Sequence, residues 1–200
     1  MANWIISASN LTKPIYDEMK KELVSARIVH ADETELEVLA EPERRPQTKS
    51  YMWVYTTGKS EDKNIILYDY KEGRSGKYAA EFLKGFTGYV HCDGWNGYDK
   101  VENIKRVGCW AHARRYFKEA INVQANINDY STVAGQGFLW IEKIFSTEDK
   151  ITDAEEIKKI RETKGKEAVD GFFNFCETAE ALPKSLTGKA VSYAINQKNN

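Results

Sequence analysis

The sequence predicts an α/β domain with a five-stranded mixed sheet flanked by helices, followed by a helical C-terminal extension or insertion. Three observations predict this class. Three extended apolar segments follow one another over residues 27–70 with short connections. A segment of helical periodicity then separates them from a fourth extended segment, as a parallel strand pair requires. Beyond about residue 110, apolar residues recur only at helical spacing.

The first elements are one helix and three strands. Residues 9–26 carry apolar side chains at four-residue steps, which indicates a helix. Strands are expected at residues 27–34, 51–56 and 64–70, because these segments combine apolar, β-branched and aromatic residues. The connections are short and polar, and one holds two prolines. Consecutive strands joined in this way favour an antiparallel meander.

The next elements supply a crossover. Residues 76–86 have helical periodicity, and a short apolar strand that ends at Asp93 follows them. A helix between two strands allows the first and fourth strands to lie side by side and parallel. A fifth short strand is expected at residues 105–109, and a helix from Trp110 to about residue 124.

These elements predict three parts of the chain. Residues 1–26 form a lead-in helix, and residues 27–124 form the sheet core. Residues 125–200 form the helical insertion or extension, because no strand pattern occurs in them.

Composition excludes several classes of protein. The chain has 200 residues, 42% hydrophobic and 30% charged, as expected of an ordinary soluble domain. It has no run of about 18 apolar residues, so no membrane span is expected. Its first residues show no secretory signal, and its three cysteines have no disulfide-like spacing, which together indicate the cytoplasm. The net charge of −1 gives no overall basic field for nucleic acid.

Two acidic residues fall in similar apolar runs. Asp32 lies within R-I-V-H-A-D-E-T, and Asp93 ends G-Y-V-H-C-D before Gly94. An aspartate in an apolar strand is costly unless its charge is compensated. If the first and fourth strands are neighbours, the two carboxylates converge and can hold Mg²⁺ or Mn²⁺, which prefer oxygen ligands. Gly94 would let a phosphate backbone approach. The alternative is two unrelated aspartates that cap turns.

The helix expected after Trp110 carries basic residues. His112 and Arg115 share one face of it, one turn apart. Arg114 and Lys118 share another face. Guanidinium groups match phosphate oxygens well, so these residues are candidate DNA contacts. A solvated helix face is an equally open interpretation.

Other chemistries lack their motifs. His91, Cys92 and Cys109 do not have the paired spacing of a zinc site. The sequence contains no nucleophile elbow, P-loop or G-x-G-x-x-G segment.

Four motifs resemble those of a known family. They are H-A-D-E-T at residues 30–34, D-G-W-N-G-Y at 93–98, C-W-A-H-A-R-R-Y-F at 109–117 and K-S-L-T-G-K-A-V-S-Y-A at 184–194. In this order they resemble the insertion-sequence sixty-six family of bacterial DDE transposases over nearly the whole chain. The resemblance implies an RNase H-like catalytic core.

The resemblance also implies a reaction. Asp32 and Asp93 would be the two aspartates of a D-D-E triad, which holds two Mg²⁺ or Mn²⁺ ions in the complete enzyme. The implied activity is metal-dependent DNA cleavage and strand transfer at insertion-sequence ends. The implied partners are element-end DNA, target DNA and further copies of the protein, since such transposases generally act as multimers.

The chain departs from the family at the third acidic residue. The family's catalytic Glu lies in an N-N-x-x-E-R type motif beyond the segment similar to residues 184–194, and the sequence stops at Asn200 without it. The expectation is therefore a truncated core with little or no strand transfer alone. A catalytically silent DNA- or protein-binding module and an RNase H-type nuclease remain open on the same fold.

Overall fold

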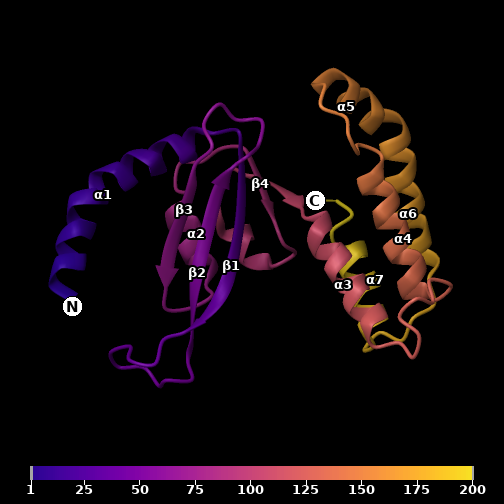
Figure 1. Cartoon of the computed structure of the whole chain (residues 1–200), viewed down its shortest axis with the longest axis horizontal. Helices are drawn as coiled ribbons and strands as arrows, with labels where there is room; N and C mark the ends of the chain where they lie inside the picture. Colours follow the sequence, from indigo (N-terminus) through magenta and orange to yellow (C-terminus); the bar gives the residue numbers. More distant parts are fainter. Residues whose placement is uncertain (1, 200) are drawn as a thin grey trace. The chain divides into compact units, whose positions relative to one another are not determined.

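The computed structural model describes residues 2–199. The chain divides into two compact units, Met1–Val107 and Gly108–Asn200, which we call the sheet unit and the helical unit (Figure 1). The boundary between the units, after Val107, comes earlier in the chain than the predicted end of the sheet core at residue 124. The helix that begins at Trp110 packs against later helices, because its apolar face is part of their core.

The sheet unit contains a five-stranded mixed sheet in the order β3-β2-β1-β4-β5. β1 is antiparallel to β2 and parallel to β4, and β2 is antiparallel to β3 (Figure 1). The predicted mixed sheet, with its meander and its parallel first and fourth strands, is confirmed, and the order is consistent with an RNase H-like core. The strands are β1 (Ile28–Glu37), β2 (Lys49–Thr57), β3 (Ile66–Lys71), β4 (Tyr89–Cys92) and β5 (Lys105–Gly108).

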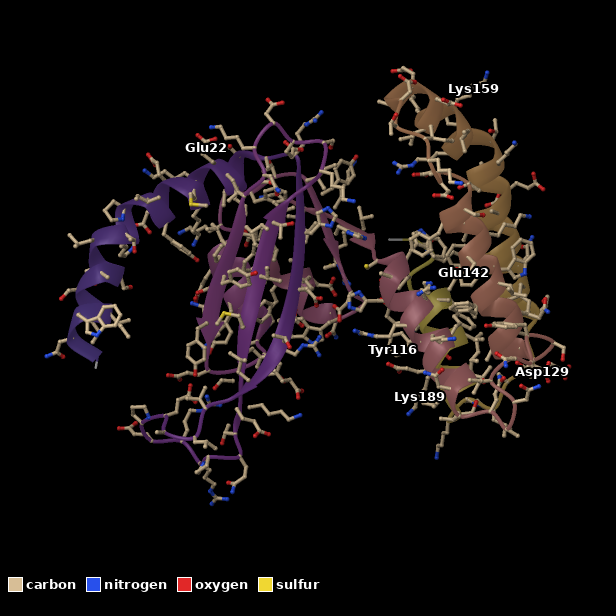
Figure 2. The ribbon with its side chains drawn as sticks, in the orientation of Figure 1. Glu22, Tyr116, Asp129, Glu142, Lys159 and Lys189 are labelled. Carbon is tan, nitrogen blue, oxygen red and sulfur yellow. The ribbon has the colours of Figure 1, made fainter. Side chains whose placement is uncertain are left out.

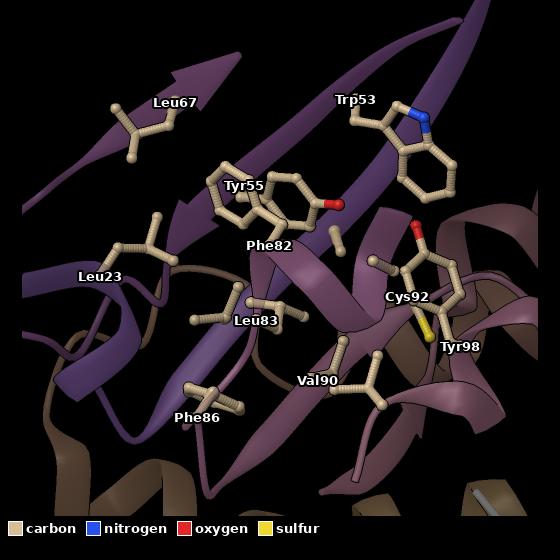
Figure 3. Close-up of a cluster of buried hydrophobic side chains, with 14 of the residues drawn as sticks. Leu23, Trp53, Tyr55, Leu67, Phe82, Leu83, Phe86, Val90, Cys92 and Tyr98 are labelled. Atoms are coloured by element: carbon tan, nitrogen blue, oxygen red, sulfur yellow. The ribbon is translucent and has the colours of Figure 1, made fainter. Parts of the chain in front are cut away.

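One face of the sheet is the core of this unit. Successive strand residues point to opposite faces, so Val29 and Ala31 of β1 are buried while Asp32 is exposed. Figure 3 shows Tyr55 of β2 stacked on Phe82 of α2 (Gly76–Phe82), with ring centroids 3.8 Å apart. The same core contains Tyr98 from the 3₁₀ helix η1 (Asn96–Lys100).

The structure gives α1 nearly the extent expected of it and makes α2 shorter. α1 (Ala2–Ser25) covers the expected lead-in helix, although the apolar periodicity begins only at residue 9, and its N-terminal half extends away from the sheet with Trp4 and Leu11 exposed (Figure 1). Its C-terminal end packs on the core through Leu23, which is fully buried. α2 ends at Phe82, before the predicted end, because the chain turns through Gly85 at a φ of 87°.

Gly76 marks a close approach that fixes α2 against η1. A Cβ at Gly76 would lie 2.2 Å from the carbonyl oxygen of Gly97, and a backbone atom has little freedom to move aside. Gly76→Ala is therefore expected to destabilise the sheet unit by about 1–3 kcal/mol through overpacking. Urea denaturation measures the effect. Gly73→Ala is the matched control, because a Cβ there meets nothing within 4 Å; equal stability of the two variants would contradict the prediction.

The helical unit is built from helices packed around aromatic side chains. Phe117, Ile141 and Phe172 are buried at its centre. The Ser185 hydroxyl accepts a hydrogen bond from the Gly188 N–H and so caps the last helix. The elements are α3 (Trp110–Asn122), α4 (Val133–Ser146), α5 (Ala154–Ile160), the π-helical turn η2 (Arg161–Gly165), α6 (Lys166–Thr178) and α7 (Leu186–Asn196). Across residues 2–199, no helix has both the length and the apolar character needed to cross a bilayer.

Candidate active site

The parallel pairing of β1 with β4 sets the positions of the two predicted catalytic aspartates. Val29 pairs with Val90 and His30 with His91, an offset of 61 residues. Asp32 and Asp93 are separated by the same 61 residues, so this register leads to them two positions further along. Asp32 is exposed within β1, and Asp93 follows directly after the last residue of β4.

The two histidines that precede these aspartates point toward each other. The Nδ1 atoms of His30 and His91 are 2.6 Å apart, so one nitrogen donates a hydrogen bond and the other accepts it. Burial lowers the pKa of His30, and the nearby His91 and Lys59 lower it further. Because residues at even spacing share a strand face, Asp32 lies on the same face of β1 as His30.

Asp93 is held by three donors. The Trp95 N–H donates to its Oδ1 at 2.9 Å, and the Arg74 guanidinium lies 3.3 Å from its Oδ2. Its carbonyl oxygen accepts from Arg106 Nη2 at 3.1 Å. The Asp93 side chain is 20% exposed, so its carboxylate is restrained yet reachable from solvent.

Glu33 is a residue of this site that the sequence predictions missed. It lies on the opposite face of β1 from Asp32, and its side chain is only 2% exposed. Its Oε1 accepts from Arg74 Nε and its Oε2 from the Tyr98 hydroxyl, each at 2.6 Å. Burial raises the pKa of Glu33, while the bonds from Tyr98 and Arg74 act in the opposite direction.

A signal for Glu33 was present in the sequence. In β1 it follows Val29 and Ala31 at steps of two, which is the buried register of the strand. A carboxylate in such a position needs a partner that satisfies its charge. What the strand pattern did not contain was the partner, because Arg74 lies 41 residues further along the chain.

The predicted DNA contacts lie on α3 in the helical unit. Arg114 forms an ion pair with Glu142 of α4, which is labelled in Figure 2. The Arg114 guanidinium and the Lys118 ammonium also lie over the Phe138 ring, at 4.9 and 5.3 Å from its centroid. Arg115 is exposed and His112 is partly buried. Asp32 and Asp93, in contrast, belong to the sheet unit.

The donor set at β1 and β4 fits a magnesium ion better than a zinc ion. Within residues 2–199, no group of three or more His, Cys, Asp and Glu side chains is arranged to hold a metal. Mg²⁺ is often held by one or two carboxylates together with water and phosphate oxygens, and Asp32 and Asp93 offer oxygens of this kind. Burial raises the pKa of the Cys92 thiol to about 11, which disfavours the thiolate that zinc binds.

The family follows from comparison with known proteins. Residues 1–200 match the protein family described as "Transposase IS66 family". The chain belongs to the IS66 transposase family. No solved structure matches this IS66-family chain.

Two relatives of this IS66-family chain come from Sinorhizobium fredii (strain NBRC 101917 / NGR234). The uncharacterized protein y4qI is 26% identical over 216 residues, which cover 99% of the chain and 39% of the relative. The uncharacterized protein y4hP is 25% identical over 203 residues, which cover 91% of the chain and 36% of the relative. The chain thus spans 39% or less of the length of these two relatives.

Proposed function

We propose that this IS66-family chain supplies two metal-binding carboxylates, Asp32 and Asp93, to a transposase that cleaves DNA and transfers strands at insertion-sequence ends. The observation that supports this most strongly is the parallel β1–β4 register, whose offset of 61 residues is also the separation of the two aspartates. Family membership supports the transposase role.

The chemistry of the carboxylates gives the proposal its mechanism. Two carboxylates brought close together would repel each other, so a divalent cation between them would favour their ionised forms. When bound, Mg²⁺ or Mn²⁺ ions supply activation of an attacking oxygen and stabilisation of the leaving oxygen of a phosphodiester. In this chain Asp32 and Asp93 would hold the metal, and the Trp95 N–H orients the Asp93 carboxylate.

Two further parts of the active enzyme belong to the same proposal. His112, Arg114, Arg115 and Lys118 contact DNA phosphates, and Arg115 is well suited because it is exposed. The third carboxylate of the triad is the glutamate that the family places beyond the segment similar to residues 184–194. We assign that role to no glutamate of this chain.

A comparison of two proteins tests the proposal. This chain and a longer protein that continues past Asn200 are incubated with DNA carrying an element end, with Mg²⁺ or Mn²⁺. We expect both to bind the metal and only the longer protein to cleave and join DNA. Equal strand transfer by both would contradict the missing-glutamate part, and metal binding by neither would contradict the role of Asp32 and Asp93. Preference for an RNA–DNA hybrid over duplex DNA would instead identify a nuclease of the RNase H type.

A second candidate is a catalytically silent DNA-binding module on the same fold, because a fold does not fix a function. Such a module would bind DNA through phosphate contacts, with an affinity that falls as salt rises. Two results together would support the module over the enzyme. The longer protein would show no metal-dependent cleavage, and its salt-dependent DNA binding would be unchanged when both aspartates are replaced by asparagine.

A further inference from the structure

We propose that Arg74 is a positioning residue, which uses the buried carboxylate of Glu33 as its anchor and holds the carboxylate of Asp93 in one orientation. This inference rests on the proposed function, in which Asp93 receives a divalent cation. It adds that Arg74, which is outside the predicted metal-binding pair, sets the orientation of this carboxylate. Arg74 is anchored on the face of β1 that is opposite to Asp32.

The anchor is rigid. The Glu33 side chain is almost fully buried, and its Oε2 accepts from the Tyr98 hydroxyl at 2.6 Å. Tyr98 itself is fully buried and packs edge-on against Trp53 and Trp95, with ring centroids 6.1 and 5.6 Å away. Core packing therefore fixes the position of the other oxygen, Oε1, which accepts from Arg74.

Arg74 connects this anchor to Asp93. Its Nε donates to Glu33 Oε1 at 2.6 Å, and its Nη2 lies 2.6 Å from the same oxygen and 3.3 Å from Asp93 Oδ2. The guanidinium also lies over the Trp95 ring, 4.6 Å from its centroid. A planar guanidinium holds its donors in a fixed fork, so it can serve two acceptors while its face stacks on a ring, whereas an ammonium group has neither the fixed fork nor a planar face.

Both oxygens of the Asp93 carboxylate are thereby restrained. Trp95 provides the N–H that holds Oδ1 and the ring that supports Arg74, and Arg74 holds Oδ2. Without Arg74 only the Oδ1 bond would remain, and the carboxylate could rotate about it. A ligand oriented before the cation arrives binds more tightly, because less of its freedom is lost on binding.

A purely electrostatic role for Arg74 predicts the opposite effect. A positive charge 3.3 Å from Asp93 repels an incoming cation, so removing the charge alone would tighten metal binding. Arg74→Lys keeps the charge and removes the fork geometry. In this variant a purely electrostatic role therefore predicts unchanged metal affinity, whereas a positioning role predicts a loss of affinity.

The first measurement needs no metal. The Trp95 N–H donates to Asp93 Oδ1, so its amide resonance and its hydrogen exchange rate report the position of this carboxylate. In Arg74→Lys we expect a shifted Trp95 resonance and faster exchange, with Asp93→Ala, which removes the acceptor of this bond, defining the full response. Arg44→Lys is the control, because Arg44 pairs with Glu41 and Ser50 in the same unit and contacts neither Glu33 nor Asp93. A Trp95 amide that is unchanged in Arg74→Lys would overturn the proposal.

The second measurement is Mn²⁺ binding by the same proteins, detected by electron paramagnetic resonance. Loss of a partner that orients a metal ligand typically costs about 10–100-fold in metal affinity, and we expect a loss of this size in Arg74→Lys. Unchanged or tighter binding would overturn the proposal. If wild-type protein binds no Mn²⁺, the proposed function of Asp93 fails, and the Trp95 amide still decides whether Arg74 positions it. If Arg74→Lys does not fold, Glu33→Gln replaces it, because the neutral anchor holds Arg74 less strongly and should change the amide in the same direction.

Discussion

Replacing Asp93 by asparagine is expected to abolish Mn²⁺ binding by this chain and metal-dependent DNA cleavage by the longer transposase. Asparagine keeps the shape of aspartate, and its carbonyl oxygen can still accept from the Trp95 N–H, so the local fold should survive. It lacks the negative charge that a hard divalent cation requires. The loss should exceed the roughly 100-fold upper range seen when only an orienting partner is removed.

Asp32→Asn should have the same effect, because the proposed cation is shared by the two residues. Metal binding is measured by titration with Mn²⁺, and cleavage with element-end DNA. Asp62→Asn is the matched control, since Asp62 is an exposed residue of the same unit in the connection between β2 and β3. Retention of metal-dependent cleavage in either Asp32→Asn or Asp93→Asn would remove that residue from the proposed site.

Removing Arg74 altogether is expected to destabilise the sheet unit by about 3 kcal/mol. Arg74→Ala leaves the Glu33 carboxylate buried with only the Tyr98 hydroxyl as a partner. Breaking a buried ion pair on one side typically costs about 3–5 kcal/mol. The lower end of this range applies because the Arg74 side chain is 36% exposed, so part of its charge is already screened by solvent.

The loss of stability in Arg74→Ala should also depend on pH. Burial already raises the pKa of Glu33, and Arg74 opposes that rise, so its removal raises the pKa further. A carboxyl whose pKa is raised on folding costs stability as pH rises from its unfolded pKa through its folded pKa. The deficit of Arg74→Ala is thus expected to be larger at about pH 8 than at about pH 5.

Hydrogen exchange of β2 amides measures the stability of the sheet unit separately from the helical unit. Arg27→Ala is the control, because the Arg27–Glu61 ion pair lies in the same unit and Arg27 is 77% exposed. An exposed pair of this kind contributes about 0–1 kcal/mol. A similar, pH-independent cost for Arg27→Ala and Arg74→Ala would contradict the role assigned to the buried Glu33.

Much of the sheet could be predicted because each strand and the crossover helix are recognisable from residues that are adjacent in the chain. The helical segment between β3 and β4 predicted a parallel β1–β4 pair, since a parallel connection needs a crossover. Asp32 and Asp93 were recognisable because an acidic residue in or beside an apolar strand is unusual. Whether these two residues bind a metal stays a prediction.

Assignments between elements were harder to predict. The apolar face of α3 was visible in the sequence, but it packs with Phe172 and Ala190 in the helical unit. Amphipathic periodicity predicts that a face will be buried without specifying the element that buries it. The end of α2 at Phe82 likewise depends on the turn through Gly85, which the helical spacing of the preceding residues does not determine.

The sequence by itself determined the succession of strands and helices and marked the two aspartates, since each of these depends on neighbours in the chain. Only the tertiary structure decided that Arg74 joins Glu33 to Asp93. These contacts bridge separations of 41 and 19 residues, and Arg74 itself lies in the connection between β3 and α2, where local pattern carries no information about partners. The contact exists because the folded sheet brings that connection over the buried carboxylate, and a buried charge is stable only where such a partner is supplied.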